Sequence, residues 1–199
     1  QWWHALRSDY MTERSFGLLR LLKLFLVATT ALFPVVLIDT IADFIIRKCS
    51  SRPHKVYVDA RLVAVYRDVY FLSRALFLVK ALFSALSSEP WVQFDCGYFI
   101  FEITQSWLGR ALAWGKRSIN PQRALLFAVV NYVEVSTAFA VLYLGNDCIT
   151  PHLRPSTALY FSLVTSTTVG FGDFTPSGIG VRLVIWQLLV FFMFVVLVA

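Results

Sequence analysis

The sequence is short of charge and lacks the residue patterns that enzymes use. Asp, Glu, Lys and Arg make up only 15% of the 199 residues, and 58% are hydrophobic. A soluble domain carries about 25% charged residues. No Ser/His/Asp or Cys/His arrangement is present, so catalysis is not expected. The balance indicates a membrane protein that is not an enzyme.

Cysteine and histidine are also scarce. The three cysteines lie far apart without a Cys-x-x-Cys pair, which argues against a disulfide framework or a zinc site and predicts free thiols. The three histidines are isolated near segment ends, so we expect them at the solvated surface and assign them no metal. These residues are Cys49, Cys96, Cys148, His4, His54 and His152.

The net charge of +6 does not indicate nucleic-acid binding, because Lys and Arg flank apolar segments instead of forming one basic stripe. Arg110, Lys116, Arg117 and Arg123 form a positive run with no acid among them. By the positive-inside rule, this linker (110–123) is expected in the cytoplasm. The loop that follows the next span would then face outside.

Two segments are long and apolar enough to cross a membrane, which takes about 20 residues. They are Leu125–Leu144 and Ile179–Ala199. A polar turn at Gly145–Asp147 follows the first span. Ser156–Ser166 then predicts a short helix after Pro155, with Ser156 and Thr157 accepting hydrogen bonds from first-turn amides. The expected order is span, re-entrant helix, loop, span.

The first 120 residues predict further helices. Leu21–Ile46 is a plausible first span, with a kink at Pro34. Arg61–Leu86 fits a helix buried in a bundle, an interfacial helix or a span, and its cations lack the every-third-residue spacing of a voltage sensor. Trp91–Trp114 is also expected to be helical, with Trp91, Trp107 and Trp114 as anchors at headgroup level.

The loop after the short helix has the residues that an ion filter needs. A dehydrated cation requires a cage of oxygens, which backbone carbonyls can supply. Carbonyls of successive residues point the same way only if right- and left-handed conformations alternate, and Gly170 and Gly172 suit the left-handed positions. Thr168 adds a hydroxyl. Val169 and Phe171 are expected to turn outward and pack against the short helix.

Thr167-Thr168-Val169-Gly170-Phe171-Gly172-Asp173-Phe174-Thr175-Pro176 resembles the signature of the potassium channel pore domain, a two-transmembrane ion channel family. The resemblance covers 121–199 and implies an outer helix at 122–144, a pore helix at 156–167, a filter at 168–172 and an inner helix at 179–199. It implies that oxygens of Thr168, Val169, Gly170, Phe171 and Gly172 bind K+. It also implies that Thr167, Asp173, Tyr160 and Phe161 support the filter.

The chain departs from that family in three places. Phe171 replaces the commoner Tyr and so lacks a hydroxyl, and Val164 stands where some members carry a Glu that pairs with the Asp. The inner helix from Val181 contains no Gly or Pro, so a hinge for gating is not evident. The gating stimulus cannot be inferred from this sequence.

Polar residues inside the spans should face protein. Asn131 and Glu134 are expected against a neighbouring helix or Arg182 as a structural pair, with an ion site as the alternative. Gln187 is expected either to line a cavity or to hydrogen-bond between helices, and its position does not decide between these.

The sequence therefore predicts an all-α membrane protein in which a potassium-channel-like pore module (121–199) follows a helical membrane or interfacial region (1–120). The expected function is passive K+ conduction by a lipid-embedded homotetramer, with K+ as the permeant ion and no cofactor. A non-selective cation channel and a non-conducting scaffold are the alternatives. Because the chain starts at Gln1 and ends at Ala199 within an apolar run, we expect a fragment, with a regulatory domain or subunit outside it.

Overall fold

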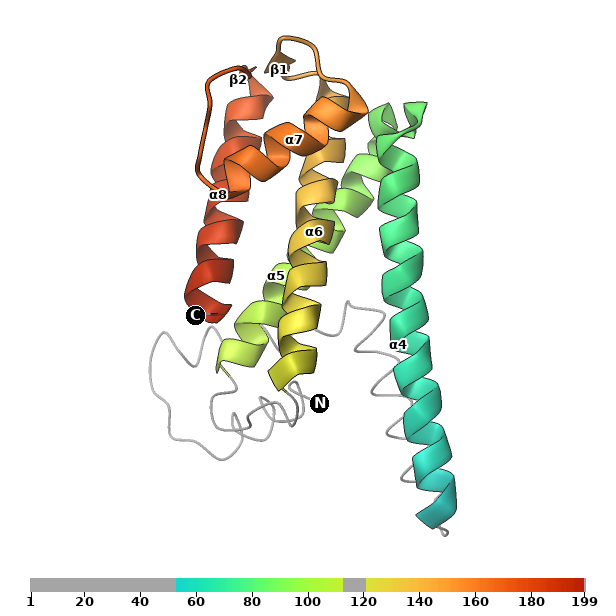
Figure 1. The fold of residues 1–199 in the computed structure, drawn as a ribbon. Helices are drawn as coiled ribbons and strands as arrows, with labels where there is room; N and C mark the ends of the chain where they lie inside the picture. Colours follow the sequence, from blue (N-terminus) through green and yellow to red (C-terminus); the bar gives the residue numbers. More distant parts are fainter. Residues whose placement is uncertain (1–52, 113–120, 199) are drawn as a thin grey trace, which may run out of the picture. The chain divides into compact units, whose positions relative to one another are not determined.

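The computed structural model describes residues 53–112 and 121–198. Helices dominate it, as the sequence predicts, and the two strands are only two residues long. The elements in Figure 1 are α4 (Pro53–Leu82), the 3-10 helix η1 (Ala85–Ser88), α5 (Pro90–Leu112), α6 (Pro121–Asn146), β1 (Ile149–Thr150), α7 (Pro155–Ser166), β2 (Thr175–Pro176) and α8 (Ile179–Val198).

Several predictions fall outside the described residues. These are the first span at Leu21–Ile46 with its kink at Pro34, the thiol of Cys49, His4, and the part of the basic linker within 113–120, together with Trp114.

The chain divides into two compact units. One comprises 1–74 with 108–117, and the other comprises 75–107 with 118–199. The second unit contains all of α6, α7 and α8, and it includes η1 and most of α5.

The three helices of the predicted pore module begin and end close to the expected residues. Pro121 and Pro155 begin α6 and α7, because proline fits the first helical turn, where its missing N–H group has no partner to lose. α8 begins at Ile179, as expected. Among the described helices, α6 and α8 are the two that meet the length and composition test for a membrane span.

The predicted polar turn at Gly145–Asp147 is wrong in part, because α6 continues through Asn146. The Asn146 side chain donates from Nδ2 to the Leu142 carbonyl (2.8 Å) and to Gln93 Oε1 on α5 (2.7 Å). Gly145 lies directly against the Ser87 carbonyl of η1. Gly145 and Asn146 remain helical because they pack closely against η1 and α5. Of the three residues in the expected turn, only Asp147 lies outside the helix.

The region before the pore module differs from expectation in two details. α4 ends at Leu82 rather than Leu86, because residues 85–88 form η1 with Ser84 accepting at its start. Trp107 is not a headgroup anchor, since it is buried and its ring lies 4.4 Å from that of Phe194 on α8. Trp91, by contrast, is half exposed.

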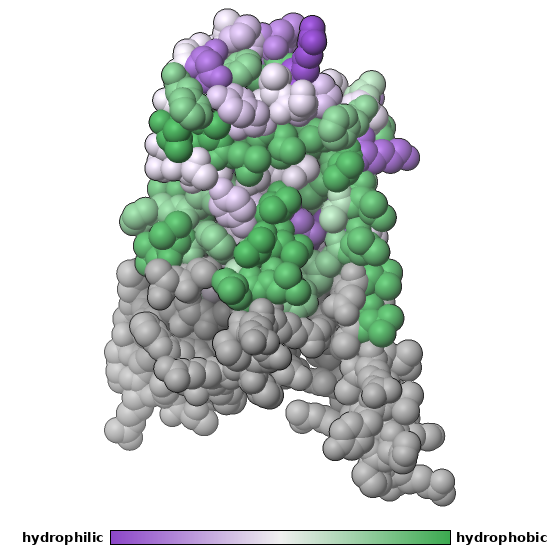
Figure 2. Space-filling model, viewed as in Figure 1, coloured by the Kyte–Doolittle hydropathy of each residue, from purple (hydrophilic) through white to green (hydrophobic). Residues whose placement is uncertain are grey.

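The core of the second unit lies between α6 and α8. Phe139 and Tyr143 of α6 are fully buried, and Phe139 packs edge-on against Trp186 of α8 at 5.2 Å. Cys96 and Cys148 are buried free thiols, as predicted. Figure 2 shows hydrophilic residues gathered at the end with the loops around β1 and β2, and a largely hydrophobic surface below them.

Gly145→Ala tests the close approach of α6 to η1. A β-carbon at Gly145 would overlap the Ser87 carbonyl oxygen, so we expect a loss of about 1–3 kcal/mol in stability, as for other overpacked sites. Gly97→Ala in α5 is the matched control, since its β-carbon would make an ordinary contact, 3.8 Å from Trp186. Thermal unfolding in detergent should therefore show a lower midpoint for Gly145→Ala only. Equal midpoints would contradict the packing.

Candidate functional site

The C-terminal end of α7 leads straight into the predicted filter. The amide of Thr167 donates to the Leu163 carbonyl (3.0 Å), that of Thr168 to Thr165 (3.0 Å) and that of Val169 to Val164 (3.2 Å). The Thr167 hydroxyl also turns back and donates to the Leu163 carbonyl at 2.9 Å. These bonds satisfy the last carbonyls of the helix, so the chain departs from it without a spacer. The negative end of the helix dipole lies at this exit, which favours a cation.

The filter backbone alternates in handedness. Its φ angle is positive at Thr168 (57°), Gly170 (54°) and Gly172 (78°) and at neither residue between them. The sequence predicts the left-handed conformation at the two glycines, which adopt it without steric cost. Thr168 was not expected to adopt it, because a β-branched residue there is strained by about 1–2 kcal/mol. Alternation over five residues is the geometry that a row of like-directed carbonyls requires.

A single chain leaves the filter open on several sides. All residues from Thr167 to Asp173 are exposed, and a β-carbon built on Gly170 or Gly172 would meet no atom within 4 Å. Within the described residues, the amides of Gly170–Asp173 donate no backbone hydrogen bond. Val169 is 55% and Phe171 69% exposed, so the expected packing against α7 is at most partial in one chain.

The aromatic residues expected to support the filter lie on two sides of α7. Tyr160 is stacked in parallel over Phe171, with ring centres 6.5 Å apart, and meets Phe174 edge-on at 6.1 Å. Phe161 is buried and packs edge-on against Tyr143 of α6 at 5.0 Å. Tyr160 therefore faces the filter, while Phe161 anchors α7 to the outer helix.

Asp173 lies beside the same tyrosine. Desolvation, a hydrogen bond to Asp173 and the negative charge of that carboxylate together raise the pKa of Tyr160. Asp173 is therefore close enough to Tyr160 of α7 for its carboxylate to act on the hydroxyl.

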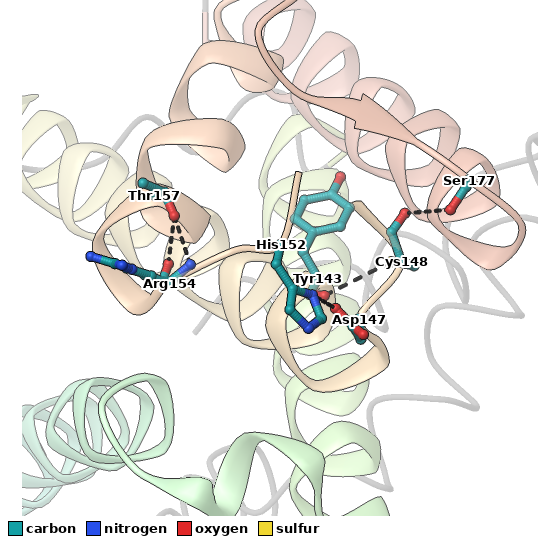
Figure 3. Close-up of polar contacts among 7 residues, drawn as sticks. All are labelled: Tyr143, Asp147, Cys148, His152, Arg154, Thr157 and Ser177. Carbon is teal, nitrogen blue, oxygen red and sulfur yellow. Dashed lines mark hydrogen bonds and ion pairs between the residues drawn. The ribbon is translucent and has the colours of Figure 1, made fainter. Parts of the chain in front are cut away.

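The loop before α7 is clamped to the segment that leaves the filter. β1 and β2 pair antiparallel, with Ile149 opposite Pro176 and Thr150 opposite Thr175. The Cys148 carbonyl accepts from the Ser177 amide (2.9 Å) and from its hydroxyl (3.3 Å), as Figure 3 shows for the hydroxyl. The clamp is not evident from the sequence, because a two-residue strand carries no periodic signal.

The turn that leads to α7 is held by its own polar contacts (Figure 3). The Asp147 carboxylate and Nδ1 of His152 are in contact, and both side chains are exposed. Thr157 accepts from the Arg154 amide (2.7 Å) and donates to the Arg154 carbonyl (3.0 Å). The sequence predicts that Thr157 accepts from a first-turn amide. Its bond instead goes to the residue before the helix.

The polar residues of the spans are buried. Asn131 and Glu134 are each 3% exposed on α6, whereas Arg182 is exposed in the first turn of α8. Glu134 lies near the middle of α6, whereas Arg182 lies near the start of α8, which begins at the end where α6 finishes. The two residues are therefore at different levels along the helices, which does not favour an ion pair between them. Gln187 is fully buried and hydrogen-bonds to α6 and α7.

Residues 120–199 match the model of a family described as ion channel. The match covers the predicted pore module, which is less than half of the chain, and this segment is similar to that family. Together with the two candidate spans, the match indicates a membrane protein, and it favours transport over catalysis. Neither the curated proteins nor the solved structures that were searched contain a match to the chain.

The reactivity of the Cys148 thiol tests the clamp between the loop before α7 and the segment that leaves the filter. Burial, followed by the charge of Asp147, raises its pKa, and only the thiolate reacts with alkylating reagents. With Cys49 and Cys96 replaced by Ala, we expect alkylation of the folded protein near pH 8 to be slower than that of the unfolded protein, since the raised pKa lowers the thiolate fraction and the buried thiol is shielded from the reagent.

Gly180→Ala provides the contrast for this measurement. A β-carbon there would lie 3.1 Å from the Cys148 sulfur and closer to its carbonyl, so the clamp must shift and alkylation should accelerate. Rapid alkylation of the folded parent protein would contradict the buried position of the thiol.

Proposed function

We propose that this chain is the pore-forming subunit of a potassium-selective channel, through which K+ passes down its electrochemical gradient. The observation that carries the proposal is the alternation of positive φ at Thr168, Gly170 and Gly172, directly after a short helix that lies between two candidate spans. A loop of this kind is tolerated at membrane depth only where protein or water surrounds it.

The chemistry of the five residues Thr168–Gly172 suits K+. The proposed ligands are the backbone carbonyls of Thr168, Val169, Gly170 and Phe171, with the Thr168 hydroxyl added at the start of the row. Gly172 completes the alternation. A non-selective cation channel is the rival within transport, and it is disfavoured because both glycines are present and both have positive φ.

The proposed assembly is a homotetramer. One chain supplies one strand of a filter, and an ion must be surrounded by several. The exposed filter residues are accompanied by an apolar face on α8, where Val181, Ile185, Leu189 and Phe192 are all exposed. These surfaces leave room for neighbouring copies and lipid, and the number four rests on the resemblance to the potassium channel pore domain.

The proposed orientation puts the linker 110–123 in the cytoplasm and the filter mouth on the extracellular or periplasmic side. The support is the positive run in that linker. The hydrophilic surface around β1 and β2 fits a mouth exposed to water.

Ion flux into liposomes tests the proposal, with Gly170→Ala as the probe. Alanine is strained at φ 54°, and in the filter that strain would turn a carbonyl away from its ion. We expect K+ flux to fall by more than about tenfold, which corresponds to roughly 1.4 kcal/mol. Gly178→Ala is the matched control, because Gly178 has φ 53° and open space but lies outside the filter.

Three results would count against the proposal. Equal permeability to K+ and Na+, measured from bi-ionic reversal potentials, would contradict the proposed selectivity. Absence of flux in the parent protein would favour a scaffold. Equal activity of Gly170→Ala and Gly178→Ala would remove the filter from the conduction path.

The assembly has a separate test. Native mass spectrometry of the purified protein should give a species of four chains. Because K+ bound in a shared filter stabilises only the assembled state, that species should withstand heating better in K+ than in Na+. Gly170→Ala should abolish this difference. A monomer or dimer in K+ would contradict the homotetramer.

A further inference from the structure

Three helices meet at one buried amide. Gln187 of α8, Tyr143 of α6 and Ser162 of α7 are all completely buried. A buried polar side chain is costly unless its hydrogen bonds are made, so a polar group at this depth needs an explanation. The hydrogen-bond partners of Gln187 provide that explanation.

The hydrogen bonds form a continuous chain across the helices. The Tyr143 hydroxyl donates to Gln187 Oε1 at 2.6 Å. Gln187 Nε2 donates to the Ser162 carbonyl at 2.8 Å and to its hydroxyl oxygen at 2.9 Å. The Ser162 hydroxyl donates to the Ser136 carbonyl of α6 at 2.7 Å. We call these four residues the Gln187 network.

The network engages both ends of the amide. Nε2 of Gln187 donates to two oxygens of Ser162, and Oε1 accepts from Tyr143. A carboxylate in the same place could not donate, and an apolar side chain could neither donate nor accept. The arrangement is therefore specific for glutamine. It also excludes a cavity-lining role for this side chain, because no part of it is exposed even in a single chain.

The network connects α7 to both α6 and α8. Ser162 lies one turn before Ser166, the last residue of the helix, and Ser166 is itself bonded to Tyr132 of α6 at 2.8 Å. Thr167 and Thr168 follow at once. A shift of α7 relative to α6 and α8 would thus move the start of the filter, where Thr168 is already in a strained conformation.

We propose that Gln187 is a positioning residue for the filter: by tying α8 to α7 it sets the filter geometry and hence the preference for K+ over Na+. This inference rests on the proposed function and adds to it a residue outside the filter motif. α8 contains no Gly or Pro from Val181 onward, so a displacement of this helix at Gln187 would be passed to α7 rather than absorbed by a bend.

Gln187→Met is the test variant, since it keeps a similar length and removes every hydrogen bond. Gln93→Met is the matched control: Gln93 also makes two hydrogen bonds between elements, to Asn146 (2.7 Å) and to the Ser87 carbonyl (3.2 Å), and neither of these bonds involves α7. The readouts are the K+ to Na+ permeability ratio in liposomes and the thermal midpoint of the assembly. We expect the ratio to fall about tenfold in Gln187→Met and to stay unchanged in Gln93→Met.

Tyr143→Phe keeps the inference testable if Gln187→Met fails to assemble. It removes one hydroxyl from the network and should lower the permeability ratio in the same direction but by less. Where both variants assemble, the double variant should be no worse than Gln187→Met alone, because the two residues act through one interaction.

The outcomes separate this inference from the proposed function. A parent protein that does not select K+ overturns the proposed function, and the inference with it. A selective parent whose ratio is unchanged in Gln187→Met, or in Tyr143→Phe where only that variant assembles, overturns the inference alone. A loss of thermal stability in both methionine variants, with selectivity intact in both, would show that Gln187 contributes to stability and does not set selectivity.

Discussion

The constraint on which this structure depends is that a backbone at membrane depth must find partners for its polar groups. α6 and α8 meet it within their own helices. The chain between them does not, because α7 is a twelve-residue helix that ends inside the unit, and within the described residues the amides of Gly170–Asp173 beyond it donate no backbone hydrogen bond. Such a segment is stable only if its surroundings hold it firmly.

Both ends of that segment are held, and by different means. At its start and after the filter, β1 pairs with β2 and the Cys148 carbonyl accepts from Ser177, so the entry and the exit are tied to each other. At its centre and end, the Gln187 network and the Tyr132–Ser166 contact tie α7 to both spans. The filter lies between these two attachments and has few contacts of its own.

The sequence predicted the parts of the module that have local signals. Prolines mark the starts of α6 and α7, and apolar length marks α6 and α8, so their bounds come out within a few residues. The conformation of Gly170 and Gly172 was likewise readable, because only glycine enters the left-handed region freely. The helical Gly145 and Asn146 were not, since their conformation is set by η1 and α5, which are far away in sequence.

The same distinction explains why the role of Gln187 stayed open until the structure was known. A lone glutamine in an apolar helix is compatible with a cavity or with a helix contact, and its partners Tyr143 and Ser162 lie in other elements at no fixed spacing. The filter motif predicts which oxygens would bind an ion but says nothing of what holds their backbone in place. In the structure, tertiary hydrogen bonds from residues that no local pattern connects hold the helix that leads into it. A strained residue such as Thr168 persists only where such bonds over-determine its position, so under the proposed function the residues that set selectivity need not be those that touch the ion.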